Sequence, residues 1–224
     1  MTIDSRIVIA LDGPAGAGKS SVSREVARRL GLKYIDSGAI YRTITLFLLR
    51  KYDKIEVGRD YLNSLKELSI SQTFNNDGTS STFLNGVDVS GDIRDEIIIN
   101  NIGIVSDDIR IRGYVNDLLR EWSMGDSIIM EGRDIGTVVF PKADVKIYLD
   151  ASVDVRACRR TEEFKGKGKT VDAEDIKNQI VLRDAEDSGR PFGSLMKADD
   201  SFYLDTSNMN KEEVIQRIIA IISS

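Results

Sequence analysis

The chain contains 224 residues, of which 41% are hydrophobic and 30% are charged. This balance is typical of a globular protein with one main core. The 31 lysines and arginines against 36 acidic residues give a net charge of −5, which argues against a dedicated nucleic-acid-binding protein. Histidine is absent and Cys158 is the single cysteine, which excludes Ser-His-Asp and Cys-His catalysis, histidine-containing metal sites and an internal disulfide. No apolar run approaches the roughly 18 residues of a membrane span and no targeting segment is recognisable, so we expect a cytoplasmic protein with neither a membrane nor a nucleic-acid partner.

The first fifty residues predict an alternation of strands and helices. The run 6–11 is apolar and rich in β-branched residues, which is typical of a strand buried on both faces of a parallel sheet. After a glycine-rich loop, the apolar spacing over 20–30 predicts a helix. A short strand at 33–35 leads to Ser37, which we expect to cap a helix that runs to about Tyr52. This order of elements is typical of an α/β fold.

The segment of about 57–90 is expected to be an insertion, and its polar part, roughly 69–90, predicts a small antiparallel sheet. Its expected elements are a helix, a strand, a turn, a second strand and a two-residue hairpin turn, at 57–68, 69–74, Asn76-Asp77-Gly78, 82–84 and Asn85-Gly86. The Asn-Gly pair between short apolar runs is a strong hairpin signal.

The rest of the chain returns to the α/β pattern. Helical spacing covers 92–122 with a break near 106–108. Further strands are expected at 127–130, 145–149 and 201–204, and further helices at 153–164, 173–187 and 211–222. We therefore expect a single domain with a core, the insertion of about 57–90 and a lid of about 156–170, the core comprising 1–56, 91–155 and 171–224.

Gly13, Gly18, Lys19 and Ser20 fit the pattern of a glycine, four residues and then Gly-Lys-Ser. The glycines let successive backbone N–H groups face a polyphosphate, and the following helix directs its positive end at the same charge. Lys19 can reach the β- and γ-phosphates, and the Ser20 hydroxyl can ligate Mg²⁺. The alternative is a glycine-rich turn with an incidental lysine, which the flanking strand and helix disfavour. The motif predicts a nucleoside triphosphate site without saying which reaction occurs there.

Longer blocks of sequence resemble the bacterial cytidylate kinases, which are P-loop nucleoside monophosphate kinases. The blocks are Leu11-Asp-Gly-Pro-Ala-Gly-Ala-Gly-Lys-Ser20, Asp36-Ser-Gly-Ala-Ile-Tyr-Arg42, Gly91-Asp-Ile-Arg94, Gly132-Arg-Asp-Ile-Gly-Thr-Val-Val-Phe-Pro141, Val145-Lys-Ile-Tyr-Leu-Asp150 and Arg183-Asp-Ala-Glu-Asp-Ser-Gly-Arg190. The resemblance implies a five-stranded parallel sheet flanked by helices, with a monophosphate-binding insertion and a mobile lid. It also implies transfer of the γ-phosphoryl group of ATP to CMP or dCMP with Mg²⁺, by an enzyme that we expect to be a monomer.

The resemblance implies a role for each matching residue. ATP would lie on the loop, the start of the next helix and two lid arginines: Gly13, Pro14, Ala15, Gly16, Ala17, Gly18, Lys19, Ser20, Ser21, Arg156 and Arg159. The acceptor nucleotide would lie on Asp36, Ser37, Tyr41, Arg42, Gly103, Arg112, Arg133, Asp134, Arg183, Asp187 and Arg190. In this second set, the phosphate would be bound by Arg42, Arg133 and Arg190. The cytosine edge would be read by Arg112 and Asp134, and the ribose would be bound by Arg183 and Asp187. The catalytic residues would be Lys19, Arg42, Arg133, Arg160 and Arg190.

The chain departs from the family pattern near the lid, where Glu186 and Ser188 occupy places that carry arginine in the family, and in two places near the expected base site. Gly103 stands where a base-contacting serine is common, and Ile109 stands where the family has proline. Ser106 is close in sequence but occupies a different helical position. Either water replaces the missing hydroxyl or the base is held less tightly.

The chemistry of the residues agrees with this interpretation. Phosphoryl transfer needs positioned positive charge more than a base, so a histidine-free chain rich in arginine suits it. Arg156, Arg159 and Arg160 are spaced to share one helix face. Next to the loop Lys165-Gly-Lys-Gly-Lys169 they favour a phosphate-closing lid, although a solvated basic face paired with Glu162 and Glu163 is the alternative.

Three other functions are alternatives to a cytidylate kinase. Adenylate, uridylate and shikimate kinases share the glycine loop, but the Gly-Arg-Asp block and the insertion argue against them. A GTP-binding switch would need an Asn-Lys-x-Asp motif, which the sequence lacks. An ATP-dependent nucleic-acid remodeller should show a basic track with stacking aromatic residues, whereas this chain is acidic and only 7% aromatic.

Overall fold

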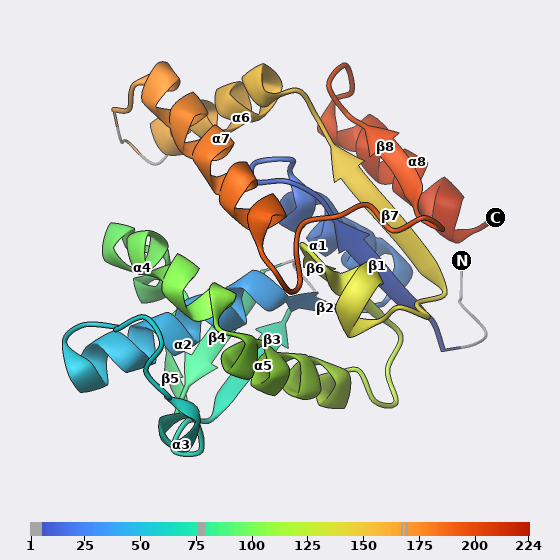
Figure 1. Ribbon diagram of the computed structural model, residues 1–224. Helices are drawn as coiled ribbons and strands as arrows, with labels where there is room; N and C mark the ends of the chain where they lie inside the picture. The colour runs from blue at the N-terminus through green and yellow to red at the C-terminus, as the bar shows by residue number, and fades with distance from the viewer. Residues whose placement is uncertain (1–5, 76–78, 167, 169) are drawn as a thin grey trace.

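The computed structural model describes residues 6–75, 79–166, 168 and 170–224, so the predicted turn Asn76-Asp77-Gly78 lies outside the described residues. In chain order, the elements are β1 (Val8–Asp12), α1 (Lys19–Leu30), β2 (Lys33–Asp36), α2 (Ser37–Tyr52), α3 (Leu62–Leu65), β3 (Ile70–Phe74), β4 (Ser80–Leu84), β5 (Val87–Asp88), η1 (Asp92–Arg94), α4 (Glu96–Asp107), α5 (Ile109–Trp122), β6 (Ile128–Gly132), η2 (Ile135–Val139), β7 (Val145–Asp150), α6 (Val153–Gly166), α7 (Ala173–Gly189), β8 (Phe202–Asp205) and α8 (Lys211–Ile222) (Figure 1).

The main sheet has five parallel strands in the order β2-β6-β1-β7-β8. This confirms the fold class expected from the sequence. Because all strands run in the same direction, their carboxyl ends meet at one edge, where ligands bind in open α/β sheets. The glycine loop follows β1 at that edge, and the Gly132-Arg133-Asp134 block follows β6 beside it (Figure 1).

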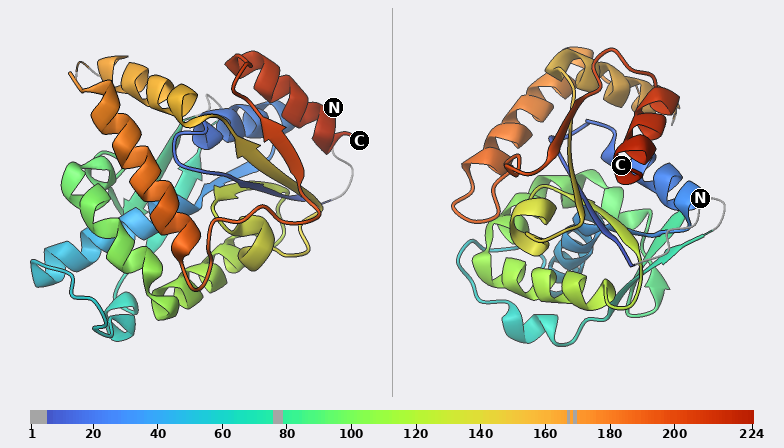
Figure 2. Two further views of the ribbon diagram at one scale, coloured as in Figure 1. Left: turned by 45° about the horizontal axis from the view of Figure 1, so that its top comes forward. Right: turned by 90° about the vertical axis from the view of Figure 1, so that its right-hand side faces the viewer.

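Each face of the sheet is covered by helices, as the apolar character of β1 predicts. Ile9 and Leu11 are completely buried in the core that contains side chains of α1 and α8. Ala10, which points to the opposite face, belongs to the core formed with α2, α4 and α5. Figure 2 shows the two groups of helices on opposite sides of the sheet.

The insertion contains the expected antiparallel sheet, with the strand order β3-β4-β5. Asn85 and Gly86 have φ values of 50° and 80°, the left-handed pair that a two-residue type I′ turn requires. Leu84 pairs with Val87 across this turn. The hairpin prediction is therefore confirmed.

The helix predicted over 57–68 is wrong in its extent. Only α3 is helical in this region, because Gly58 adopts a φ of 82° and Val57 is 85% exposed. A left-handed residue cannot continue a right-handed helix. The apolar residues of this segment are buried singly instead, as Tyr61 and Leu65 are.

The cap of α2 also differs from the prediction. Asp36, rather than Ser37, is the capping residue, and its Oδ1 accepts a hydrogen bond from the Ala39 N–H at 2.8 Å. Ser37 is the first helical residue, and its hydroxyl donates to the carbonyl oxygen of Glu131 at 2.6 Å. That bond joins the start of α2 to the end of β6.

Helices α6 and α7 form a hairpin over the carboxyl edge of the sheet (Figure 1). A small apolar cluster of Ala157, Ile176 and Ile180 joins the two helices, separate from both cores of the main sheet. In the described part of the chain, no helix combines the length and the apolar character that crossing a membrane requires.

Candidate active site

The glycine loop is held closely against the neighbouring strands. A Cβ atom at Gly13 would lie 2.0 Å from the carbonyl oxygen of Leu149 in β7, so no other residue fits without moving the strand. Gly18 has a φ of 93° and stands immediately before α1, where Ser21 donates to its carbonyl oxygen at 3.0 Å. The loop therefore has the backbone form that a phosphate cradle requires.

Lys19 is folded into this loop. Its Nζ donates to the carbonyl oxygens of Gly13 and Pro14, each at 2.8 Å. Burial and the neighbouring Arg133 lower the pKa of Lys19 to about 7. A phosphate anion in the loop would offset both effects and favour the charged lysine.

Two helices of the hairpin reach the same loop. Asp184 of α7 accepts from the Ala15 N–H at 3.0 Å, and its other oxygen accepts from Arg156 of α6 at 2.5 Å. Arg156 also donates to the Ala15 carbonyl oxygen at 2.8 Å. Arg159 donates to Thr206 and, at 3.4 Å, to the carbonyl oxygen of Ala17.

The structure does not bring Arg160 to the loop. Its Nη1 pairs with Glu163 at 2.7 Å, and its guanidinium carbon lies 4.7 Å from the centre of the Phe164 ring. The arginines Arg156, Arg159 and Arg160 therefore do not all contact the phosphate loop. Arg156 and Arg159 face the loop, while Arg160 makes the surface pair that was the alternative interpretation.

Near the phosphate loop, three guanidinium groups converge on one carboxylate. Asp187 is completely buried, and its oxygens lie 2.7 Å from Arg133 Nε, 3.3 Å from Arg183 Nε and 2.6 Å from an Arg190 nitrogen. Burial alone would raise the pKa of Asp187, but the three arginines lower it. With three cations around a single anion, the cluster suits a phosphate and the adjacent hydroxyl groups of a nucleotide.

A second buried ion pair lies beside this cluster. Arg112, at 2% exposure, donates to Asp134 at 2.5 Å and to the Ser106 carbonyl oxygen at 2.9 Å. Its guanidinium carbon lies 5.4 Å from the centre of the Tyr41 ring. Burial raises the pKa of Asp134, and Arg112 opposes that shift. Gly193 leaves room for this arrangement, since a Cβ atom there would lie 2.3 Å from an Arg112 nitrogen.

Ser106 connects the two clusters. Its buried hydroxyl accepts from Arg190 at 3.0 Å, while its carbonyl oxygen accepts from Arg112. Gly103 lies one turn earlier on α4, where an added Cβ would be 4.0 Å from an Arg183 nitrogen. Gly103, which stands where the family commonly has a serine, therefore lies next to the arginine cluster.

Arg42 is held at the start of α2. It donates to Asp36 Oδ2 at 3.1 Å, and an added Cβ at Gly38 would lie 3.1 Å from an Arg42 nitrogen. Among the described residues, the buried Nε atoms of Arg42 and Arg112 have no hydrogen-bond partner. Buried donors without partners indicate where a ligand would bind.

Two further carboxylates lie at the carboxyl ends of β1 and β6, and the sequence analysis missed both. Asp12 accepts from the N–H groups of Ile135 and Gly136 at 2.9 and 2.7 Å, which fixes the turn that carries Arg133 and Asp134. Burial raises the pKa of Asp12 to about 6. Asp12 lies within the block 11–20 and Glu131 immediately precedes the block 132–141, so a polar residue that ends an apolar strand was the available signal.

The second of these carboxylates, Glu131, is buried next to the phosphate loop. It accepts a hydrogen bond from the Tyr34 hydroxyl, and it interacts with the Ser20 hydroxyl and with Lys19. Burial raises the pKa of Glu131. A hydroxyl and a carboxylate at this place are the oxygen ligands that Mg²⁺ prefers, so the residues fit a metal ion bound mainly through phosphates.

A glycine loop after the first parallel strand, a lysine within it and a facing arginine cluster define the class of P-loop phosphotransferases. Comparison with known proteins then identifies the group within that class. The model of the cytidylate kinase family matches residues 9–224. The chain belongs to the cytidylate kinase family.

Individual relatives agree with this assignment. The cytidylate kinase of Thermosipho melanesiensis is 42% identical over 214 residues, covering 96% of this chain and 95% of its own. The cytidylate kinase of Bacillus cereus is 42% identical over 221 residues, covering 99% and 98%. Among solved structures, an uncharacterized protein from Eubacterium ventriosum superposes with a TM-score of 0.55 at 13% identity, covering 98% of this chain and 99% of its own. A sugar kinase from Janibacter sp. reaches 0.50 at 13% identity, with 98% and 95% coverage. These two likenesses concern the fold alone.

Proposed function

We propose that the protein transfers the γ-phosphoryl group of ATP to CMP or dCMP, giving ADP and CDP or dCDP. The observation that carries this proposal is the arrangement of two buried clusters opposite the phosphate loop. One is the arginine group around Asp187, and the other is the Arg112–Asp134 pair. The first suits a nucleotide's phosphate and sugar, and the second offers a cytosine edge both a donor and an acceptor.

The donor nucleotide would lie on the loop and the hairpin. Its phosphates would face the backbone of 13–18 and be bound by Lys19, whose charge they would stabilise. Ser21 supports the loop through its bond to Gly18. Arg156 and Arg159 would reach the donor from α6, since both already contact loop carbonyl oxygens.

Mg²⁺ would accompany ATP. Ser20 and Glu131 would hold it, because their oxygens interact beside Lys19 in the structure. When bound, the ion supplies charge neutralisation between the transferring phosphate oxygens. Ser20 was predicted from the motif, and Glu131 is added by the fold.

The acceptor would lie with its phosphate toward the loop. Arg42, Arg133 and Arg190 would bind that phosphate, and Arg183 with Asp187 would bind the ribose. Arg112 and Asp134 would read the base beside Tyr41. The Ser106 carbonyl oxygen would support Arg112, and the Ser106 hydroxyl would support Arg190. Asp36, Ser37 and Gly103 would border this site.

The residues of this chain would act mainly by position and charge. The attacking phosphate oxygen of the acceptor is already anionic, so no side chain has to remove a proton from it. Lys19 and the arginines would hold the two phosphates in line and stabilise the charge that is shared between them in the transition state. Arg160 would take part only after a movement of α6 that breaks its pair with Glu163.

We further propose that the enzyme acts as a monomer in the cytoplasm, on nucleotides rather than on nucleic acid or a membrane. One chain supplies every residue of the proposed site. Cys158 is a free, exposed thiol, which is typical of a reducing compartment.

A single assay tests the reaction. ATP and MgCl₂ are supplied with each nucleoside monophosphate in turn, and ADP formation is followed by a coupled reaction. We expect CMP and dCMP to be the best acceptors and turnover to stop when EDTA is added. Rapid GTP hydrolysis without a response to any monophosphate would exclude the kinase assignment.

A further inference from the structure

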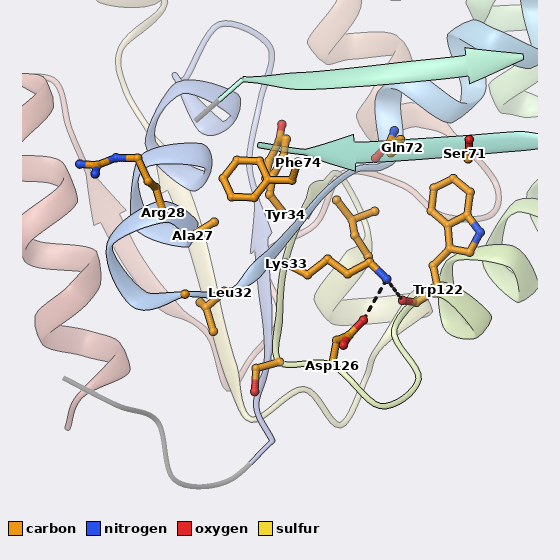
Figure 3. A pocket seen from close by; sticks show the side chains of 13 residues that line it. Ala27, Arg28, Leu32, Lys33, Tyr34, Ser71, Gln72, Phe74, Trp122 and Asp126 are labelled. Carbon is orange, nitrogen blue, oxygen red and sulfur yellow. Dashed lines mark hydrogen bonds and ion pairs between the residues drawn. The ribbon is translucent and has the colours of Figure 1, made fainter. Parts of the chain in front are cut away.

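Gln72 joins the insertion to the proposed acceptor site. It lies on β3, where the inward-facing residues Ile70, Gln72 and Phe74 alternate with the exposed Ser71 and Thr73. Strand β2 is the edge strand of the main sheet, and β3 crosses near it. Figure 3 shows Gln72 and Phe74 on β3 beside β2, with Tyr34 next to Phe74.

The amide of Gln72 makes both hydrogen bonds that a neighbouring strand would make. Its Nε2 donates to the Asp36 carbonyl oxygen at 2.8 Å, and its Oε1 accepts from the Asp36 N–H at 3.1 Å. Only a side-chain amide carries a donor and an acceptor in this geometry. One step along, Phe74 packs on Tyr34 with ring centres 5.7 Å apart, so β3 contacts alternate residues of β2.

The residue that Gln72 holds is the one that orients Arg42. One Asp36 oxygen caps α2 through the Ala39 N–H at 2.8 Å, and the other accepts from Arg42 at 3.1 Å. Gly38 leaves little space between these groups, since an added Cβ would lie 3.3 Å from Asp36 Oδ1 and 3.1 Å from Arg42. A shift of the Asp36 peptide would therefore move the guanidinium group.

We propose that Gln72 is a positioning residue for the acceptor phosphate. By fixing the Asp36 peptide at the free edge of β2, it sets the position of Arg42 and links that position to the placement of the insertion. This inference rests on the proposed function, because it takes Arg42 as a ligand of the acceptor phosphate. No contact joins Gln72 to the residues proposed for ATP among those described.

The test compares Gln72→Met with Thr73→Val, the matched control on the exposed side of the same strand. Met has the size of Gln but cannot make either bond. We expect Q72M to raise the KM for CMP about five- to thirtyfold, as for the loss of one or two neutral hydrogen bonds. The KM for ATP should stay within about twofold, as for a site that the change does not touch. T73V should leave both constants unchanged. Equal increases in both KM values, or a change in kcat alone, would overturn the inference.

A double-mutant cycle with Arg42→Lys separates this inference from the proposed function. If Gln72 acts through Arg42, adding Q72M to R42K should raise the KM for CMP no further. If R42K leaves that KM unchanged, the acceptor-site assignment fails. If R42K raises it and Q72M does not, or if the two effects multiply, only the role of Gln72 fails.

Gln72→Glu covers the case in which Q72M does not fold. The carboxylate can still accept from the Asp36 N–H but cannot donate to the carbonyl oxygen. It should also raise the KM for CMP selectively, and a normal KM for CMP in a folded Q72E would overturn the inference.

Discussion

At the scale of single residues, the candidate site depends on charged groups that the protein has largely removed from water. Lys19 is the clearest case, because burial and Arg133 lower its pKa to about 7. An ATP phosphate would keep it cationic. The two carbonyl oxygens that it now contacts hold it in the loop where that phosphate would bind.

Replacing Lys19 by Met removes this charge while preserving most of the side-chain length. We expect kcat to fall at least about a hundredfold, on the scale of losing one preorganised charge contact. The coupled assay measures it. Lys51→Met, at the exposed end of α2, is the control and should have no comparable effect. Near-normal turnover in K19M would contradict the place given to Lys19.

We expect Asp134 to make the enzyme prefer CMP over UMP. An ionised Asp134, held by Arg112, can accept from the cytosine amino group but repels the uracil carbonyl oxygen. Asp134→Asn can turn its amide to donate to uracil. The ratio of kcat/KM for CMP over UMP should fall about ten- to a hundredfold, since one base contact contributes about 1–3 kcal/mol.

The control for this substitution is Asp117→Asn on the exposed side of α5, which should leave the ratio unchanged. An unchanged ratio in D134N as well would mean that the base is read elsewhere. Ser106, which contacts both Arg112 and Arg190, would then be the next residue to substitute.

At the scale of elements, the α6–α7 hairpin is the segment best placed to move. Its apolar cluster is separate from the main cores, and polar contacts at Ala15 tie it to the phosphate loop. Segments with few buried apolar contacts to the rest of a protein open most readily.

Hydrogen exchange tests the lid prediction for 156–170. We expect this segment to exchange quickly without ligand and to be protected when ATP and CMP are both bound, because closure excludes water from the phosphates. Helix α8 lies on the main sheet and serves as the internal control. Equal protection of 156–170 in both states would count against a lid.

At the scale of the whole molecule, Asp12 ends strand β1 of the main sheet and binds the turn that carries Arg133 and Asp134. Its pKa of about 6 is above the ordinary value of 3.8. The folded protein therefore keeps a proton that the unfolded chain has lost between these pH values. The contribution of Asp12 to the free energy of unfolding therefore falls across this range as the pH rises.

We expect this effect of Asp12 to amount to about 1–3 kcal/mol between pH 4 and pH 7, from the size of the shift. Urea denaturation of the nucleotide-free wild type and of Asp12→Asn measures it. Asn cannot ionise, so the stability of the wild type relative to D12N should decline with rising pH and level off above about 6.5. A constant difference would show that Asp12 titrates alike in both states.

The sequence by itself determined the features that depend on neighbouring residues. The glycine loop, the Asn85-Gly86 turn and the break between α4 and α5 follow from local backbone preferences. The limits of α8 were predicted correctly because Asn210 and Glu213 form a capping box within four residues. The Arg183–Asp187 pair followed from helical spacing, since its members are one turn apart.

Tertiary structure alone decided the contacts between distant segments. No local sequence pattern predicts a hydrogen bond between residues that are far apart in the chain. The structure shows such bonds between Asp184 and Ala15, Gln72 and Asp36, and Ser106 and Arg190. Arg160 is a case in which the local pattern misleads. Its spacing from Arg156 and Arg159 predicted that it would bind phosphate with them, whereas in the structure it pairs with Glu163. Local preferences determine the backbone conformation of each segment. The packing of helices on the sheet determines which polar groups are buried away from water, and buried polar groups must form hydrogen bonds or ion pairs with one another.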